Sequence, residues 1–466
     1  VRGIESSGML CSAKELGISD DASGLFVLAP EAPIGQNIRE YLDLDDRALT
    51  LKLTPNRADC LSLVGIAREV AALTDSALML PAIAEVAVST NAKRDVVLDA
   101  PTACPLYCGR VISGVDAKTP TPEWMKQRLE RSGIRSISAL VDITNYVMLE
   151  LGQPLHAFDN ALLEGAIHAR LASKGEAICL LNEQVLELQD DVLLISDDKR
   201  AVAMAGIMGS ANSGISLETE EMFLESAFFS PRAIAGRARR YGFSSDASHR
   251  FERGVDFGST RRALERATQL ILDICGGDAG PITEAKANLP SRAPVKLRLS
   301  RLAKVLGIDF SAEEVAGLLT RLALDHEIEA GDFIVNPPTH RFDIEIEEDL
   351  IEEVVRLYGY DKVPARSPRA QLSMLPQTEA SRSVSRIRHI LADRGFQEVI
   401  NFAFVEESWE ADFARNDTPI KLANPIASQM SVMRSTLLGG LVANVSTNLK
   451  RKQNRVRVFE TGRCFF

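Results

Sequence analysis

The sequence lacks two features that would define broad classes of protein: a long apolar run and a paired cysteine motif. No stretch of about 18 apolar residues occurs, the length that a membrane-spanning helix needs, so no membrane span is expected. The seven cysteines are scattered, and none forms a CxxC pair. Cys104 and Cys108 lie close together in sequence, but no second pair stands nearby to complete a zinc site. Reduced thiols and a cytoplasmic location are therefore the simplest prediction.

An excess of basic residues is also lacking, because the formal net charge is −11. This acidic total argues against nonspecific coating of nucleic acid. It does not exclude an RNA ligand, because local patches make the contacts to phosphate. Arginines gather between residues 232 and 253, and they are Arg232, Arg237, Arg239, Arg240, Arg250 and Arg253. The pattern alone fits a phosphate-binding surface and an ordinary solvated surface equally well.

Length and composition predict a multidomain protein. With 466 residues, 45% of them hydrophobic, roughly two to four globular domains are expected. The chain begins with Val rather than Met and ends in an apolar stretch, so we expect a fragment of a longer protein that lacks both ends. A polar stretch at 89–105 and a proline-containing segment after 366 indicate boundaries. Asn56 or Asp59 is expected to cap a helix.

The stretch 140–159 predicts a helix followed by a turn. Apolar residues recur at helical spacing from Leu140 to Leu151, Gly152 is a typical C-terminal stop, and Pro154 prevents the helix from resuming. Thr144 and Asn145 are polar residues within this helix. His156 is expected just past its end, in a turn, where a rigid helix could present the three side chains together. The alternative is a core helix whose polar groups are satisfied locally.

Glu225 lies in an otherwise apolar strand, MFLESAFF. A buried carboxylate there must be paired or must await a polar ligand, because isolated burial is costly. Strand alternation could equally direct Glu225 to solvent. Upstream, Gly206 and Gly209 would let the backbone approach a ligand closely. That glycine-rich run lacks the lysine of a P-loop, so a phosphate cradle is not expected.

A strongly acidic segment is a candidate cation site. Asp349, Glu352 and Glu353 fall at i, i+3 and i+4 and share one predicted helix face, and Asp343 precedes them on an extended segment. Four carboxylates gathered in this way would be relieved by a hard divalent cation. An acidic helix N-terminus that favours the helix dipole explains the same pattern.

The segments VDITNYVMLE, GQPLHAFD, AGIMGS and SSDASHRFERGVD resemble the editing module of the bacterial phenylalanyl-tRNA synthetase β subunit. The resemblance extends along the whole chain. It implies a multidomain α+β protein with a B3/B4-type editing domain, a small winged-helix-like B5 domain and a partial class II synthetase-like antiparallel sheet domain. The implied domains are the tail of an OB-fold tRNA-binding domain at 1–20, a B1-like helical/β domain at 21–90, the B3/B4 editing domain at 91–290, B5 at 295–365, and a degenerate class II core at 366–466.

The resemblance also implies roles for individual residues. Glu225 corresponds to the carboxylate that reads the hydroxyl of tyrosine, and His156 to the histidine of the hydrolytic site. Thr144 and Asn145 correspond to groups that hold the ester and ribose. The pocket residues are Gly209, Ser245 and Ala247, with Ser245 standing where the family often has Thr.

Cofactors and partners follow from the same resemblance. The four carboxylates Asp343, Asp349, Glu352 and Glu353 correspond to ligands of a Mg²⁺ shared with the α subunit. ATP would be a substrate of the holoenzyme, an α₂β₂ tetramer that binds tRNA(Phe). Val458 stands where the class II motif has Arg, two residues before Glu460, so this domain should not itself activate an amino acid.

The expected function is that of a ligase subunit: ATP-dependent charging of tRNA(Phe) together with α, and hydrolytic editing of Tyr-tRNA(Phe) in this chain. A hydrophobic pocket rejects an analogue that only adds a hydroxyl by only about a hundredfold, so a second, hydroxyl-selective site would raise fidelity. Two alternatives remain: a non-catalytic scaffold that binds tRNA and a partner, and a free-standing trans-editing deacylase.

Overall fold

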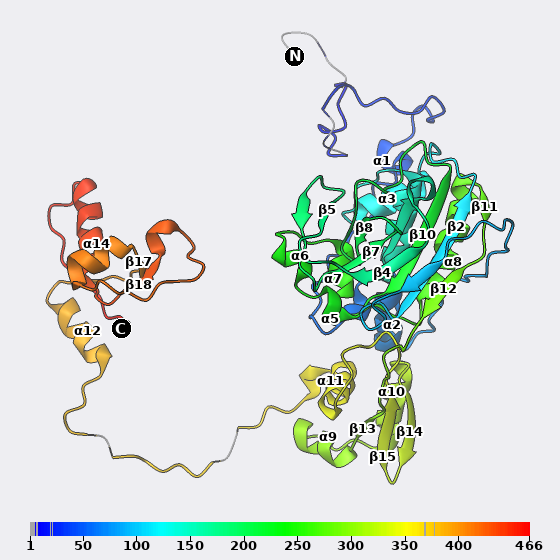
Figure 1. Cartoon of the computed structure of the whole chain (residues 1–466). Helices are drawn as coiled ribbons and strands as arrows, with labels where there is room; N and C mark the ends of the chain where they lie inside the picture. Colours follow the sequence, from blue (N-terminus) through cyan, green and yellow to red (C-terminus); the bar gives the residue numbers. More distant parts are fainter. Residues whose placement is uncertain (1–4, 6–7, 19, 21, 368–369, 377) are drawn as a thin grey trace. The chain divides into compact units, whose positions relative to one another are not determined.

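The computed structural model describes residues 5, 8–18, 20, 22–367, 370–376 and 378–466. It divides into two compact units, which meet in sequence between residues 365 and 366 (Figure 1). Both units contain helices and strands, so the predicted α+β class is confirmed. None of the helices in the described part of the chain has the length and apolar content needed to cross a bilayer.

An antiparallel sheet forms the centre of the first unit. Its strand order is β11-β2-β10-β3, and β12 also pairs with β2. The strands are β2 (Leu106–Ser113), β3 (Leu155–Asp159), β10 (Glu221–Phe228), β11 (Asp278–Ala279) and β12 (Thr283–Lys286). Because β10 is flanked on both sides, its side chains are buried from Met222 to Phe228.

Helices cover one face of this sheet. They are α3 (Glu123–Arg131), α4 (Ala139–Leu151) and α8 (Thr260–Cys275). Alternate residues of β2 and β10, such as Cys108 and Leu224, form a core with Ile143 of α4. The predicted helix at 140–151 is therefore confirmed, and it ends at Gly152, whose φ of 83° favours glycine.

A second sheet packs against the other face. Its order is β1-β4-β7-β8-β9. The strands are β1 (Val96–Leu98), β4 (Ile167–Leu171), β7 (Leu193–Ser196), β8 (Ala201–Met204) and β9 (Met208–Gly209). The intervening set of side chains from β2 and β10, including Tyr107 and Phe223, shares a core with Ile195 and Met204. Period-two alternation thus divides each central strand between two cores.

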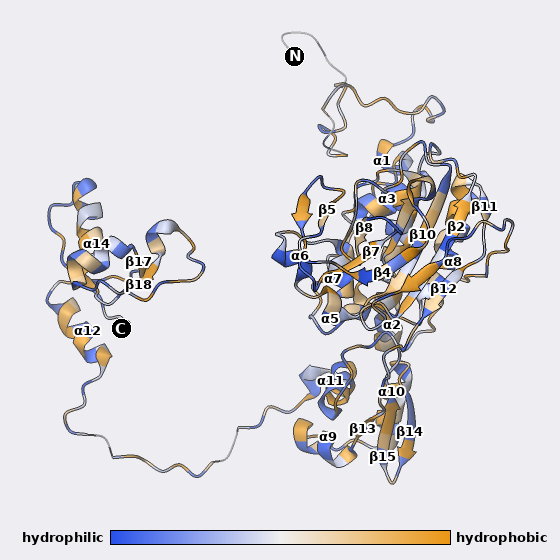
Figure 2. Cartoon of the chain, in the orientation of Figure 1, coloured by the Kyte–Doolittle hydropathy of each residue, from blue (hydrophilic) through white to orange (hydrophobic). Residues whose placement is uncertain are grey.

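Short elements complete this block around the second sheet. They are η2 (Asn160–Leu162), the hairpin β5 (Ala177–Cys179) with β6 (Val185–Glu187), α5 (Pro231–Ile234), α6 (Arg237–Arg240) and α7 (Asp246–Phe251). Helix α6 is drawn mostly in blue in Figure 2, because three of its four residues are arginine.

The N-terminal region is helical where it is regular. It contains α1 (Ile38–Tyr41), η1 (Ala58–Cys60) and α2 (Leu63–Thr74). Residues 22–90, all described, form no strand, so the β part of the predicted helical/β domain is not seen. The tail predicted at 1–20 lies partly outside the described residues, and residues 5, 8–18 and 20 form no strand. Ser62 caps α2, not Asn56 or Asp59, because its side chain accepts from the Gly65 amide.

The segment 295–362 forms a small three-stranded sheet with three helices. The sheet order is β13-β15-β14, all antiparallel. The elements are β13 (Val295–Leu297), α9 (Leu299–Leu306), α10 (Ala312–Arg321), β14 (Asp325–Glu329), β15 (Asp332–Asn336), α11 (Glu347–Tyr358) and η3 (Tyr360–Lys362). Their apolar faces share one core, which includes Leu302, Phe333 and Val354.

The second unit has two separate pairs of strands. β16 (Gln397–Glu398) pairs in parallel with β19 (Val458–Phe459), and β17 (Phe404–Val405) pairs antiparallel with β18 (Val432–Met433). Its helices are α12 (Val384–Asp393), α13 (Glu407–Trp409), η4 (Glu410–Ala414), η5 (Ser428–Met430) and α14 (Leu438–Lys450). The predicted antiparallel sheet is thus represented by one short pair.

Ser311→Ala should weaken α10 locally. Ser311 and Glu314 form the predicted capping box, in which the Ser311 hydroxyl accepts from the Glu314 amide and the Glu314 carboxylate accepts from the Ser311 amide. Loss of the cap should cost about 1 kcal/mol. Hydrogen exchange of the α10 amides should show correspondingly faster opening. Ser300→Ala, an exposed serine in α9, is the control and should leave this exchange unchanged.

Candidate active site

Three neighbouring strands place Tyr107, Glu225 and His156 on one face of the central sheet. Glu225 of β10 lies directly opposite His156 of β3 in the antiparallel register. On its other side, Glu225 lies opposite Gly109 of β2, so Tyr107 is its diagonal neighbour. The prediction of a turn at His156 was wrong, because Leu155–Asp159 forms strand β3. Strand pairing, not a helix end, brings the imidazole to the carboxylate.

Glu225 is buried, which settles the choice left open by its strand. Only 6% of the residue is exposed. The phenol of Tyr107 donates a hydrogen bond of 2.7 Å to Glu225 Oε2. Burial raises the pKa of Glu225 to about 7, although the hydrogen bond from Tyr107 acts in the opposite direction. The site therefore contains a carboxyl group that changes protonation near neutral pH.

His156 is held as a neutral imidazole. Its ring packs edge-to-face on Phe158, with the centroids 4.5 Å apart. Burial lowers the pKa of His156 to about 4. Its Nε2 atom is buried and has no hydrogen-bond partner among the described residues. A buried polar atom without a partner is costly, so this nitrogen is available to a ligand or a water molecule.

Glu225 and His156 open onto the same cavity, which has a volume of about 60 Å³. Its walls come from the start of β3, the segment from β8 to β9, and α7. The lining residues are Pro154, Leu155, His156, Ala203, Met204, Gly206, Ile207, Met208, Gly209, Glu225, Ala247 and Phe251. A side chain on Gly209 is excluded, because a Cβ atom there would lie 2.5 Å from the His156 ring. The cavity thus contains four of the predicted site residues.

Ser245 does not line this cavity, but it contacts residues of the segments that do. Its hydroxyl donates to the carbonyl of Ile207 at 2.7 Å and accepts from the amide of Ser248. Ser245 therefore caps α7 and ties that helix to the segment carrying Gly209. These contacts place Ala247 in the cavity wall.

Thr144 and Asn145 are not brought together with His156 and Glu225. Both lie on α4, whose apolar side chains pack on the opposite face of the sheet. The Thr144 hydroxyl donates to the carbonyl of Val141 at 2.7 Å, which satisfies it within its own helix. Neither residue lines the cavity. Their predicted contact with an ester remains a prediction without a geometric link to the cavity.

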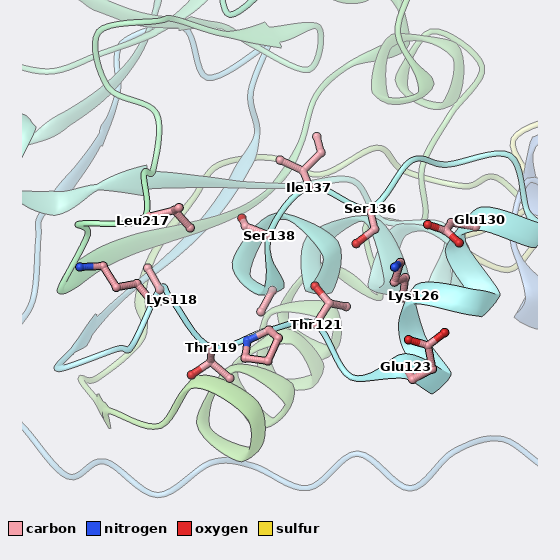
Figure 3. Close-up of a pocket in the computed structure, with 13 residues that line it drawn as sticks. Lys118, Thr119, Thr121, Glu123, Lys126, Glu130, Ser136, Ile137, Ser138 and Leu217 are labelled. Carbon is pink, nitrogen blue, oxygen red and sulfur yellow. The ribbon is translucent and has the colours of Figure 1, made fainter. Parts of the chain in front are cut away.

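A larger pocket of about 560 Å³ lies at the N-terminal ends of α3 and α4 (Figure 3). It is lined by polar side chains such as Thr121, Lys126 and Ser136, and by none of the predicted site residues. Because it also lacks a buried titratable group, we place the candidate chemistry at the smaller cavity.

Sequence reasoning missed Tyr107. The signal was present, because a tyrosine in a buried strand needs a partner for its hydroxyl. What the sequence could not supply was the pairing of β2 with β10, which sets Tyr107 beside Glu225.

Three of the four predicted metal ligands are already bound by other groups of this chain. Arg341 donates to Asp343 at 2.9 and 2.8 Å and to Glu353 at 2.9 Å. Burial would raise the pKa of Glu353, but the hydrogen bonds from Arg356 and Arg341 outweigh it and lower this pKa to about 2. Asp349 accepts from the backbone amides of Glu345 and Ile346. Glu352 is exposed.

Arginine therefore already binds two of the four carboxylates, Asp343 and Glu353, that a cation would need. The same holds for Asp59, Cys60 and Glu69, the one grouping of possible metal ligands among the described residues. Arg57 donates to all three side chains. Neither set fits a metal ion unless the guanidinium group leaves.

The predicted arginine patch is largely engaged within the chain. Arg237 and Arg240 pair with Asp191, at 3.2 and 2.6 Å. Arg250 and Arg253 bond to neighbouring acidic residues and carbonyls. The exposed side chains of Arg232 and Arg239 make no hydrogen bond or ion pair with the described residues, so two of the six arginines remain open to an anion.

Comparison with known proteins identifies the family. A B3/4 domain model matches residues 103–276, a tRNA synthetase B5 domain model matches 295–360, and a phenylalanyl tRNA synthetase beta chain CLM domain model matches 363–466. The phenylalanine–tRNA ligase beta subunit of Dechloromonas aromatica is 68% identical over 468 residues, a match that covers 100% of this chain. The chain belongs to the family of phenylalanine–tRNA ligase β subunits. The β subunit of Aromatoleum aromaticum is 63% identical over 467 residues.

The chain spans 59% of the length of these two relatives. A crystal structure of an N-terminal fragment of the β subunit from Pyrococcus horikoshii covers 70% of this chain and 95% of its own, at 17% identity and a TM-score of 0.34. This likeness is too weak to carry an argument. The match to the B3/4 domain model, residues 103–276, contains all the residues that line the cavity, so the candidate site lies within this domain.

Glu225→Gln should change how stability depends on pH. The pKa of Glu225 is raised in the folded state, so its contribution is fully present below the unfolded value of 4.5 and is lost as pH rises through about 7. The variant should be more stable than wild type at pH 8, by roughly 3 kcal/mol at most, because each pKa unit is worth about 1.4 kcal/mol.

Urea unfolding followed by Trp124 fluorescence measures this effect. Trp409→Phe confines the signal to the first unit, because the sequence has two tryptophans. Equal pH dependence in the wild-type chain and the Glu225→Gln variant would contradict a buried, titrating carboxylate.

Arg341→Met should destabilise the small three-stranded domain by roughly 3 kcal/mol, because it leaves the carboxylate of Asp343 without its cation. Arg298→Met, which removes an exposed partner of Glu347, is the control and should have little effect. Hydrogen exchange of α11 provides the measurement. Protection of α11 by added Mg²⁺ in the wild-type chain would show instead that these carboxylates bind a cation.

Proposed function

We propose that this chain hydrolyses tyrosine esterified to tRNA(Phe), as the editing part of a phenylalanine–tRNA ligase. The proposal depends on one observation: a buried carboxylate and a neutral, unpartnered imidazole open onto one cavity. Glu225 would accept a hydrogen bond from the phenol hydroxyl of a tyrosyl group. His156 would hold water against the ester, take up a proton from that water as it attacks the carbonyl carbon, and return the proton to the departing ribose oxygen as the ester bond breaks.

Selectivity for tyrosine follows from burial. A phenylalanyl group would leave Glu225 desolvated without a second donor, whereas a tyrosyl group supplies one. Sites built to hydrogen-bond a substrate hydroxyl reject the analogue lacking it by about 10⁴-fold. The cavity holds only about two water molecules at roughly 30 Å³ each, so an aromatic ring must widen it on entry.

The wider activity of the holoenzyme is part of the same proposal. Charging of tRNA(Phe) with phenylalanine and ATP would require the α subunit, in an α₂β₂ tetramer in the cytoplasm. The exposed Arg232 and Arg239 are the groups we propose to contact tRNA phosphate. Mg²⁺ would need ligands beyond Asp343, Asp349, Glu352 and Glu353, because arginine and backbone amides already engage three of them.

The second unit supports a non-catalytic role for its class II-like domain. Glu460, at the degenerate motif, accepts from Arg434 at 2.6 Å and from Asn401 at 2.8 Å. Both charged side chains are nearly fully buried. This carboxylate therefore holds strands and loops together, which a free-standing deacylase would not need.

His156→Ala and Glu225→Ala should each slow hydrolysis of Tyr-tRNA(Phe) by the chain. Loss of the imidazole should cost about 10²-fold or more, as for a general acid–base group. Loss of the carboxylate should cost about 10- to 100-fold, the value of a hydrogen bond to a charged group. Deacylation of radiolabelled Tyr-tRNA(Phe) measures both, and the chain alone should form no Phe-tRNA(Phe).

His168→Ala is the matched control, because His168 lies on β4 between Asp99 and Asp198 and outside the cavity. An inert wild-type chain, or unchanged rates in both cavity variants, would reject the proposal. Salt-sensitive RNA binding without hydrolysis would favour the scaffold instead. Thr144→Val tests the remaining prediction for α4: a loss of rate would assign Thr144 a role that its position does not explain.

A further inference from the structure

We propose that Tyr107 is a positioning residue for Glu225: it holds one carboxylate oxygen so that the other alone faces the hydroxyl of the ligand. This inference rests on the proposed function, because it specifies how the same site reads a phenol. Tyr107 does not line the cavity, so it acts through Glu225 and not on the ligand itself.

Tyr107 is well suited to a fixed role. It is fully buried, and its ring stacks on Phe223 with an interplanar angle of 13°. Phe223 in turn fills the space above Gly109, where a Cβ atom would lie 2.2 Å from the Phe223 ring. Gly109, the residue opposite Glu225 on β2, therefore has no side chain there, and the ring of Phe223 fills that space.

The hydrogen bonding of Glu225 is asymmetric. Oε2 accepts from Tyr107, whereas Oε1 accepts from no donor among the described residues. Burial raises the pKa of Tyr107 well above its ordinary value, so its phenol keeps the proton that it donates. A carboxylate can accept on both oxygens. One position is therefore filled by the protein, and one remains for a donor in the cavity.

Few titratable groups lie near Glu225, and Tyr107 is the one that donates a hydrogen bond to its carboxylate. The nearby titratable groups are Tyr107 on β2, His156 on β3 and Cys104 ahead of β2. Helix α7 contributes Ala247 and Phe251, and the segment 206–209 contributes no titratable side chain. Without the phenol, the carboxylate would lose the donor that favours its ionised form. It would also be free to rotate away from the cavity.

Tyr107→Phe tests the inference in the whole chain. The KM for Tyr-tRNA(Phe) should rise about tenfold, with a much smaller change in kcat, because a hydrogen bond to a charged group is lost. In the pH profile of kcat/KM, the limb that reports ionisation of Glu225 should move to higher pH by about one pH unit. In a Glu225→Gln background, Tyr107→Phe should add no further pH shift.

Tyr146→Phe is the matched control. Tyr146 is also a buried tyrosine, but its hydroxyl accepts from Arg128 and belongs to the core on the other face of the sheet. It should leave both KM and the pH profile unchanged. An equal loss in the two variants would overturn the inference, because it would assign the effect to packing. Unchanged KM and pH profile in Tyr107→Phe would overturn it while leaving the proposed function in place.

The two failures can be told apart without hydrolysis. If the wild-type chain is inert, the proposed function fails, but urea unfolding followed by Trp124 still reports the protonation of Glu225. Stability in Tyr107→Phe should then continue to fall to a higher pH than in wild type. No shift of this limit would overturn the positioning role as well.

Discussion

The antiparallel register between β10 and β3 is the constraint on which the site depends. It sets Glu225 directly opposite His156, and the pairing of β10 with β2 sets Tyr107 one diagonal step away. A slip of one residue would turn Glu225 into the core formed with α4 and α8, where apolar side chains surround it. The apolar cores on both faces therefore stabilise this register, and the register keeps Glu225 opposite His156.

Burial has opposite effects on the two groups that share the cavity. It raises the pKa of Glu225 to about 7 and lowers that of His156 to about 4. At pH values between these, the imidazole is neutral while the carboxyl group is largely protonated, so these two groups give the cavity little charge. A phenol donor at Oε1 would favour the ionised carboxylate, so binding of a hydroxylated ligand should release a proton near neutral pH.

Local signals in the sequence predicted local structure well. The helix ending at Gly152 and the capping box of Ser311 and Glu314 depend on residues within a few positions, and both are confirmed. The polar residues of helix α4 show what such local signals cannot predict. Helical spacing identifies Thr144 as mid-helix, but it does not reveal that α4 covers the face of the sheet opposite His156. Such facts depend on strand order, which no single stretch encodes.

For the acidic segment, too, the sequence pattern did not reveal which groups bind the carboxylates. Spacing put Asp349 and Glu353 on one helix turn, but Arg341, which neutralises Glu353, lies twelve residues earlier and was not part of the pattern. Within this chain, arginine side chains bind Asp343 and Glu353, backbone amides bind Asp349, and Glu352 is exposed.

Glu225 differs from the other buried acidic residues in the donors that bind its carboxylate. Asp142, Asp197 and Glu410 each accept from several hydroxyl, amide or backbone donors. Glu150, Glu265 and Glu353 each pair with arginine. Among the buried carboxylates of the described chain, Glu225 alone has a single, neutral donor. Because one phenol does not offset the free-energy cost of burying a carboxylate, Glu225 is the position where the hydroxyl group of the proposed ligand would supply a second donor.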